Sequence, residues 1–521
     1  MGWTPRRLRA PMNAAVGIAG PSEIAVRAGG EMAAAGGNAV DVAVAATFAA
    51  LSTEVGIVGL DAGAFITVWG PGEAPVVIDG GVAMPGVGRP GERFGAAGRA
   101  VALDYGGGMR TIVGYGAVGV GGAVAALGEA SAGWGRLGWA DLLQPAAEQV
   151  RDGFPLGTAS HTWLQYSHQE IFGWQAESRA AIHDPRGGLL APGALVRVPG
   201  LADTLAELGR EGPQAFYTGR LGAAIAACVE AGGGLMGAQD RAAYRALRRE
   251  PIHCAVDDWS IALPPLPTVG GAALAAMLAR VRGAPAGAWT PESVAVLAAA
   301  QREVFEFLRA TPADQAPDVF LARVLDWAKR GGDPRAIESP STVHVSAMDS
   351  SGLACAVTAS SGYGSGVMVP GTGIWLNNCL GELELNPRGF HGLPPGERIS
   401  SNMAPVAARS TGGDALAVGS PGAERITTAL LQVILNFMRL GMSLEEALAA
   451  PRLHVELADA GWQVAAEPGL PLASVEMPCR VFDGLSMFFG GAGAVLREAD
   501  GTLVAAADPR RQGAAMVVDR E

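Results

Sequence analysis

The chain has 521 residues, of which 49% are hydrophobic and 17% charged, and its formal net charge is −12 at pH 7. This length indicates one large domain or two of medium size, with enough apolar material for a sizeable core. The negative charge argues against nucleic acid as a partner. We therefore expect a protein that acts on a small molecule.

The five cysteines are scattered and have no CxxC spacing. This pattern predicts reduced packing thiols, with neither a disulfide framework nor a zinc site, and we expect no metal and no cofactor. The N-terminal segment has an arginine pair, but no clean apolar stretch follows it. No apolar run reaches membrane-spanning length. We expect a cytoplasmic protein without a membrane partner.

The first half of the chain predicts helices with a few strands. Residues 21–51 indicate two helices, with Ser22 as the N-cap of the first. Residues 64–70 and 74–81 are typical of paired buried strands. The region from about 120 to 335 is mostly helical in pattern, with the clearest segments at 123–135, 140–153, 201–212, 221–233 and 292–310.

Strand patterns become frequent later in the chain. Residues 251–267 predict a hairpin that ends in a proline-rich turn, and residues 342–348 and 353–360 predict a second hairpin around "DSSG". A helix over 424–441 and strands within 493–509 follow. Because helices both precede and alternate with strands, we expect a layered α/β or α+β body.

The hexapeptide "GYGAVG" at 114–119 fits a dinucleotide-binding glycine pattern. Such a site also needs a strand-turn-helix unit and an acidic residue about twenty positions later. Asp141 lies inside a predicted helix and does not end a second strand. A tight glycine turn is the better interpretation.

Residues 342–348, "TVHVSAM", alternate strictly. A period of two places Thr342, His344 and Ser346 on one face of a strand and three apolar residues on the other. An ordinary half-buried strand would explain this pattern. If the Ser341–Thr342 bond were cut, however, Thr342 would carry both a nucleophilic hydroxyl and a free α-amine. That amine titrates at about 7.7–8.0, so it could act as the hydroxyl's own general base.

A set of motifs in a fixed order carries a family resemblance. They are "GGNAVDVAVAATFA", "VRDGFPL", "LADTL", "AFYTG", "PPLPTVGGAALAAML", "TVHVSAMD", "GVMVPGTGIWLNN", "ISSNMAP", "GSPGAERI", "APRLHVE" and "DGTLVAAADPR". From about residue 12 to 513 the chain resembles the gamma-glutamyltranspeptidases, which are N-terminal-nucleophile (Ntn) hydrolases. The resemblance implies an α+β fold, a four-layer αββα sandwich. It also implies a proenzyme that cuts itself into segments 1–341 and 342–521, which then form a heterodimer.

The same resemblance implies roles for individual residues. Thr342 takes the nucleophile position, and Gly422 with Ala423 takes the oxyanion-hole position, where the family usually has glycine second. Ser360 falls where the family has a hydroxyl residue near the nucleophile's amine.

The resemblance also implies residues that bind substrate. Ser400 and Ser401 match a serine pair near the substrate carboxylate. Because "SSNMAP" is one residue longer than some family versions, either serine or Asn402 could face the pocket.

Two departures from the family pattern concern the substrate. The family's glutamyl-binding arginine corresponds to Gly81, which we expect to leave open space. Arg89 or Arg93 could supply a cation, although no motif puts either one there. Glu382 stands where the family has an aspartate that binds the ammonium group of the substrate. Alternatively, Glu382 is a solvated charge on a loop.

Three functions follow as hypotheses. The first is an autoprocessed Ntn hydrolase or acyltransferase acting on a small molecule that is not a standard gamma-glutamyl donor. The second keeps the threonine chemistry but hydrolyses a carbon–carbon bond next to a carbonyl, as is thought of some relatives. The third is a binding homologue without catalysis, which the loss of the arginine would favour.

Overall fold

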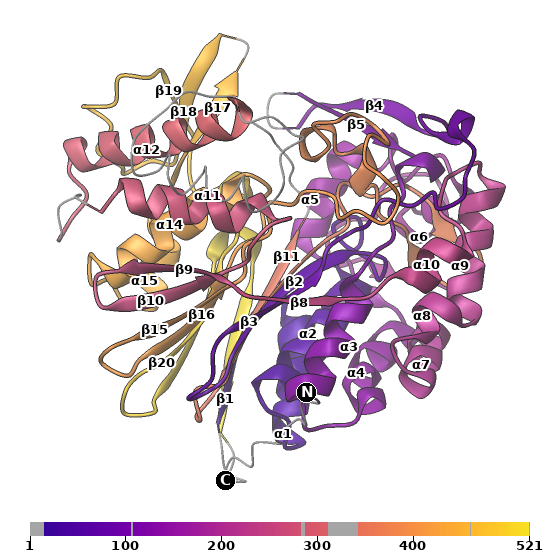
Figure 1. The fold of residues 1–521 in the computed structure, drawn as a ribbon, viewed down its shortest axis with the longest axis horizontal. Helices are drawn as coiled ribbons and strands as arrows, with labels where there is room; N and C mark the ends of the chain where they lie inside the picture. The colour runs from indigo at the N-terminus through magenta and orange to yellow at the C-terminus, as the bar shows by residue number, and fades with distance from the viewer. Residues whose placement is uncertain (1–14, 106–107, 283–286, 311–341, 459, 520–521) are drawn as a thin grey trace.

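Two β-sheets face each other at the centre of the computed structural model, which describes residues 15–105, 108–282, 287–310, 342–458 and 460–519 (Figure 1). The first sheet has seven strands, in the order β22 (Ala514–Val518), β1 (Val16–Gly20), β11 (Val343–Asp349), β12 (Ala354–Ser360), β2 (Gly63–Trp69), β3 (Val76–Gly80) and β8 (Leu247–Arg249). The second has six, in the order β21 (Leu503–Ala507), β20 (Gly493–Arg497), β16 (Ala415–Gly419), β15 (Val406–Ser410), β10 (Trp259–Leu263) and β9 (Ile252–Val256). Neighbouring strands in both sheets are antiparallel.

Mostly small side chains, above all alanine, fill the space between the two sheets. Met348 and Ala356 of the first sheet pack against Ala407 and Ala417 of the second, within one buried cluster. Alanine lets two sheet backbones approach closely, while the larger apolar side chains form the cores on the outer faces.

Helices cover the outer face of each sheet (Figure 1). The first sheet is covered by α1 (Glu23–Ala34), α2 (Ala39–Thr53) and α3 (Ala123–Trp134), and the second by α11 (Val269–Arg280), α14 (Arg425–Met438) and α15 (Leu444–Ala449). Every residue of α2 is buried because α2 lies between the sheet and the neighbouring helices. The chain is therefore a mixed helix and sheet protein, as expected.

Most of the predicted elements are present. Ser22 caps α1, and Asn38 with Asp41 forms a capping box at the start of α2. The predicted helices correspond to α3, α4 (Trp139–Arg151), α7 (Leu201–Glu211), α9 (Arg220–Ala231), α12 (Pro291–Ala310) and α14. Both predicted hairpins form, as β9–β10 and β11–β12, and "GYGAVG" is a tight turn with Gly114 at φ 92°. Residues 311–335, predicted to be helical, lie outside the described residues.

Several strands were not predicted. Among them are β1, β15, β16, β22 and the three-stranded sheet of β17 (Leu453–Ala458), β18 (Gly461–Ala466) and β19 (Cys479–Val481). The β15–β16 hairpin is rich in alanine, which has a low strand propensity, so its pattern gave little signal.

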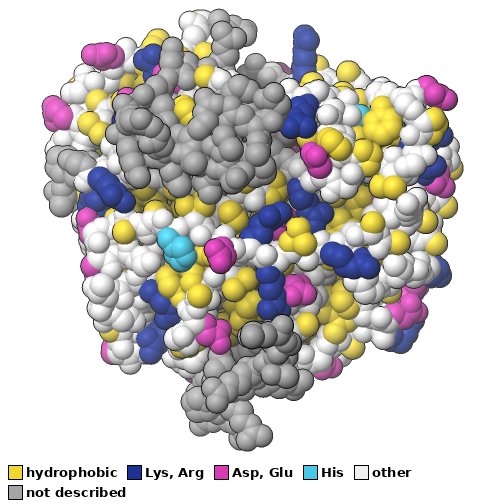
Figure 2. Space-filling model, viewed as in Figure 1, with side chains coloured by type: hydrophobic (Ala, Val, Ile, Leu, Met, Phe, Trp, Pro, Cys, Tyr) yellow, Lys and Arg dark blue, Asp and Glu magenta, His cyan; other side chains and the backbone are white. Residues whose placement is uncertain are grey.

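Two further features are the distribution of charge on the surface and the length and apolar character of the helices. Figure 2 shows acidic and basic side chains interspersed on the face of this view. Among the helices of the described ranges, none combines the length and the apolar character needed to cross a membrane.

Candidate active site

Thr342 directly precedes β11 and is 5% exposed. Every residue of β11 is buried, so the alternative interpretation as an ordinary half-buried strand is wrong: the polar face is covered as well. The ring of His344 lies against Gly419 at the end of β16, and Ser346 Oγ donates to the carbonyl oxygen of Gly493 at 3.1 Å. The polar face of β11 therefore points at the second sheet.

Strand register sets Ser360 beside Thr342. The antiparallel pairing of β11 with β12 matches Val343 to Ala359, so the next pair along the same register is Thr342 and Ser360. Ser360 is the last residue of β12 and pairs on its other side with Gly63 of β2. Residues directly opposite in such a pair have Cβ atoms about 4.5–5.5 Å apart. Two residues with hydroxyl groups thus meet at this end of the sheet.

The loop between β16 and α14 lies at the same end of the sandwich. His344 packs against Gly419, whereas Met348, farther along β11, shares a cluster with Ala415 and Ala417. The facing strands β11 and β16 therefore run in opposite directions, and the chain that leaves Gly419 continues toward the Thr342 end of β11.

Gly422 and Ala423 in this loop have positive φ, 125° and 63°, and both are buried. In the part of the chain that the structure describes, neither backbone N–H donates to an acceptor. They precede Glu424, the N-cap residue of α14, and the N-terminal end of a helix favours negative charge. A loop of this kind can bind an oxyanion with backbone donors.

Glu382 is 2% exposed, so its interpretation as a solvated loop charge is wrong. A Cβ built on Gly362 would lie 2.8 Å from Glu382 Oε1 and 2.4 Å from Asn378 Oδ1, which shows how closely this carboxylate approaches the backbone two residues after Ser360. Asn378 holds the turn by accepting the Tyr363 N–H at 2.6 Å. Glu382 therefore lies close to the Thr342–Ser360 pair.

A second acidic residue, Glu384, accepts a short hydrogen bond from the Tyr363 hydroxyl. Burial raises the pKa of Glu384 well above its usual range, and the neighbouring Glu382 raises it further. The carboxylate of Glu424, which follows Ala423, acts in the same direction. This side of the site is acidic. Among the described residues, no three His, Cys, Asp or Glu side chains are arranged to hold a metal ion.

The region around Gly81 is closely packed. A Cβ at Gly81 would lie 3.0 Å from Asp79 Oδ1 and 3.2 Å from Phe65 Cζ, so the expectation of open space is wrong. The Gly81 N–H donates to Asp79 Oδ1 at 2.8 Å, and Tyr244 donates its hydroxyl to the Gly81 carbonyl at 2.6 Å. A larger side chain could enter only if these neighbours moved.

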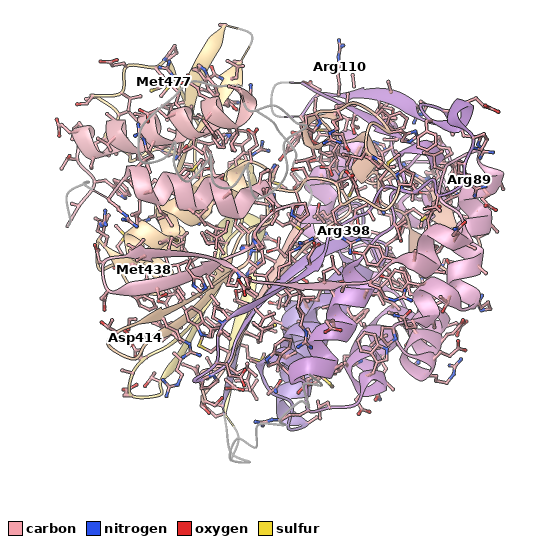
Figure 3. All side chains as sticks on the ribbon, in the orientation of Figure 1. Arg89, Arg110, Arg398, Asp414, Met438 and Met477 are labelled. Atoms are coloured by element: carbon pink, nitrogen blue, oxygen red, sulfur yellow. The ribbon has the colours of Figure 1, made fainter. Side chains whose placement is uncertain are left out.

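The two arginines considered as replacement cations bind elsewhere. Arg89 pairs with Glu230 and donates to the Leu235 carbonyl, and Arg93 donates to the Gly234 carbonyl. Figure 3 shows Arg89 at the edge of the molecule.

Arg398, which the sequence analysis did not single out, lies near the centre of the same view. The backbone of Arg398 forms an isolated antiparallel β-bridge with Ala83. Its guanidinium lies 4.1 Å from the centre of the Tyr244 ring, and its Nε lies 3.6 Å from Asp79 Oδ1. Arg398 is thus a cation beside Gly81, although Asp79 already pairs with it. The sequence feature that could have pointed to Arg398 is its position directly before the "ISS" motif at residues 399–401.

One apolar cluster joins the segments that the family motifs single out. It contains Val82 after Gly81, Cys379 before Glu382, and Ile399 before Ser400. Ser401 is buried, and its Oγ accepts the Met403 N–H at 3.1 Å. Residues far apart in sequence therefore meet at one place.

Asn402 also belongs to this region. Its Nδ2 atom is buried and has no hydrogen-bond partner within the described residues. Ser400 is half-buried.

The fold matches that of solved acylase structures. A cephalosporin acylase from Bacillus halodurans superposes with a TM-score of 0.78 at 24% identity, covering 98% of this chain and 97% of that one. The two chains therefore share one fold over nearly their whole length.

Sequence comparison identifies the family. The sequence pattern described as gamma-glutamyltranspeptidase matches residues 25–316 and 308–518. The acylase ACY 1 proenzyme of Pseudomonas sp. (strain SE83) is 31% identical over 518 residues, covering 95% of this chain and 92% of the relative. The glutathione hydrolase proenzyme of Pseudomonas aeruginosa is 31% identical over 487 residues, covering 84% and 83%. The chain belongs to the gamma-glutamyltranspeptidase family of Ntn hydrolases.

Proposed function

We propose that this chain is an autoprocessed Ntn hydrolase or acyltransferase that works through a threonyl acyl-enzyme. The observation that carries the proposal is the register of β11 and β12, which pairs Val343 with Ala359 and, extended by one residue, puts Thr342 opposite Ser360. The backbone N–H groups of Gly422 and Ala423, in the loop at the same end of the sandwich, donate to no acceptor among the described residues. The two facing sheets with helices outside would be the four-layer αββα sandwich, shared between segments 1–341 and 342–521. Ser341, on one side of the proposed cleavage bond, lies outside the described residues.

The chemistry follows from the groups at Thr342. After cleavage the α-amine takes the proton of Oγ while Oγ attacks a carbonyl carbon of the substrate. The negative charge that forms on the carbonyl oxygen is held by the N–H groups of Gly422 and Ala423. The amine then gives its proton to the leaving group, and an acyl ester on Thr342 results. Water, or an acceptor amine, resolves the ester by the same steps in reverse.

The acyl group that fits is one without an α-carboxylate. A buried carboxylate costs several kcal/mol without a cationic partner, and an arginine fork is its best partner. Gly81 supplies no fork, and the space beside it is filled. The buried carboxylate of Glu382 favours a substrate amine instead. We therefore propose a small acyl amide with a bulkier or less charged acyl portion, in line with a relative named acylase.

Mass analysis under denaturing conditions tests the processing step. The purified protein should yield one fragment ending at Ser341 and one starting at Thr342, and an acylating electrophile should label Thr342. A single uncut chain with no label would favour the binding homologue.

Kinetics test the acyl preference. The ratio kcat/KM should be higher for acyl amides that lack the α-carboxylate than for a gamma-glutamyl amide. Efficient turnover of the gamma-glutamyl amide would contradict this preference. Arg398 would then be the first residue to mutate in a search for the cation that binds the α-carboxylate. Turnover of a substrate with a carbon–carbon bond next to a carbonyl, but of no amide, would favour the second hypothesis.

A further inference from the structure

A chain of hydrogen bonds crosses from the first sheet to the second through His344, which is 3% exposed. Its Nδ1 lies 2.9 Å from Thr358 Oγ1 on β12, and its Nε2 lies 2.7 Å from Ser346 Oγ on β11. Ser346 Oγ in turn lies 3.1 Å from the carbonyl oxygen of Gly493 on β20. Both ring nitrogens are therefore engaged, and all these groups are buried.

The direction of every hydrogen bond follows from the last acceptor. The Gly493 carbonyl can only accept, so the Ser346 hydroxyl donates to it. Ser346 Oγ then accepts the proton of His344 Nε2, and His344 Nδ1 accepts the hydroxyl proton of Thr358. The ring is neutral, and burial lowers the pKa of His344 to about 3. One tautomer satisfies the whole chain.

The chain ends at the base of the proposed oxyanion loop. Gly493 pairs in register with Gly419, the last residue of β16 before that loop. The His344 ring also presses on Gly419 directly: a Cβ there would lie 2.2 Å from His344 Cε1. The ring thus touches one member of this glycine pair and holds the other through Ser346.

The segment before Gly493 supports the loop itself. The Gly491 N–H donates to Ser420 Oγ at 3.3 Å, and a Cβ on Gly422 would lie 3.0 Å from Gly490 Cα. A shift of Gly493 would therefore move the backbone against which Ser420 and Gly422 rest.

We propose that His344, as the neutral Nε2–H tautomer, is a positioning residue that holds the Gly419–Gly493 strand ends so that the N–H groups of Gly422 and Ala423 face the carbonyl attacked by Thr342. This inference rests on the proposed function. It assigns His344 no proton transfer with the substrate, because both of its nitrogens are occupied within the chain of hydrogen bonds. Oxyanion donors act mainly in the transition state, so their misplacement lowers kcat more than it raises KM.

The test uses the processed enzyme and an acyl amide, with rates normalised to the amount of free Thr342 N-terminus. Ser346→Ala removes the link to Gly493 and should lower kcat about tenfold, with KM changed less than about twofold. His344→Leu should lower kcat about a hundredfold. His344→Gln should recover much of that loss, because its amide can donate to Ser346 Oγ. Thr358→Val, nearly equal in volume, should behave like Ser346→Ala.

The matched control is Thr204→Val. Thr204 is also buried, and its hydroxyl likewise joins a distant segment by donating to a backbone carbonyl, that of Thr372, at 2.8 Å. Thr204→Val should lower Tm comparably but leave kcat unchanged. If Ser346→Ala and His344→Leu lower only Tm, or raise KM in proportion to the loss of activity, the inference is wrong. If the wild type neither cuts itself nor reacts with an acylating electrophile, the proposed function fails first, so the two failures are distinguishable.

Discussion

The two sides of the candidate site are built differently. The reaction side consists of strand ends and backbone groups: Thr342 and Ser360 are set by one strand register, and Gly422 with Ala423 offers N–H groups. The acyl side consists of side chains on loops, among them Glu382 and Glu384. The reaction side keeps the family pattern almost unchanged, whereas the acyl side departs from it at Gly81.

On the proposed function, this difference gives a physical reason for a changed specificity with the same chemistry. A strand register or a backbone donor cannot be moved without disturbing both sheets, whose facing surfaces are closely packed. A loop side chain can be exchanged at small cost to the fold. The largest effects of mutation should therefore fall on the reaction side, and selective effects on the acyl side.

The largest effect is expected at Thr342. Thr342→Ala removes the proposed nucleophile, so the chain should stay uncut and the activity should fall by a factor on the order of 10⁴ to 10⁶. Thr342→Ser keeps a hydroxyl and should still cut itself. Fragment masses and initial rates measure both effects. Normal cleavage of Thr342→Ala would show that the reaction side has been assigned to the wrong residue.

Acid should weaken the fold through His344. Its pKa is lowered to about 3 in the folded chain, against about 6.5 when unfolded, so the unfolded chain binds more protons between these values. Stability is thus full above about pH 6.5 and is lost as the pH falls toward 3, by an amount on the order of 4 kcal/mol.

His344→Gln should flatten this dependence, which urea unfolding at several pH values measures. His454, whose pKa burial also lowers, is present in both proteins, so their difference isolates His344. Equal slopes for the two proteins would mean that His344 does not stay neutral in the fold.

Glu382→Gln tests the acyl side. The loss of a charge-assisted hydrogen bond of about 1.5–3 kcal/mol should lower kcat/KM about 10- to 100-fold for an acyl group that carries an amine. The same variant should turn over an acyl group without an amine at nearly the wild-type rate, so the second substrate is the control. An equal loss on both substrates would place Glu382 on the reaction side.

The smallest effect is expected at Ala423, a non-glycine residue with φ of 63°. A left-handed conformation costs an L-residue about 1–2 kcal/mol, and glycine avoids this cost but loses about 0.5–1 kcal/mol of chain entropy. Ala423→Gly should therefore change the unfolding free energy by less than about 1 kcal/mol and keep kcat within about threefold. Ala423→Val, branched at Cβ, should lose both stability and activity. If valine were tolerated as well as glycine, the loop would not need this conformation.

Much of the fold followed from local patterns. The cap at Ser22, the β11–β12 hairpin and the helix over residues 424–441 were predicted because capping, turn chemistry and periodicity act within a few residues. The β15–β16 hairpin was missed because its alanines face the other sheet, and only that partner makes small side chains favourable there.

The site was predicted less completely than the fold. The motifs pointed to Thr342, Ser360 and Gly422, which the fold brings to one end of the sheets. Sequence alone did not show that Glu382 is buried or that the space around Gly81 is filled. Arg398 was missed because its partners, Asp79 and Tyr244, lie more than 150 residues away in the chain.

By itself, the sequence determined which residues could react: the alternation around Thr342 and the order of the motifs are properties of the chain. Only the tertiary structure decided what surrounds them. It turned the polar face of β11 toward the second sheet and gave His344 the one set of partners that keeps it neutral. The physical reason is that a hydroxyl or an imidazole has the same intrinsic chemistry in any chain, whereas its burial and its hydrogen-bond partners come from segments that only folding brings together.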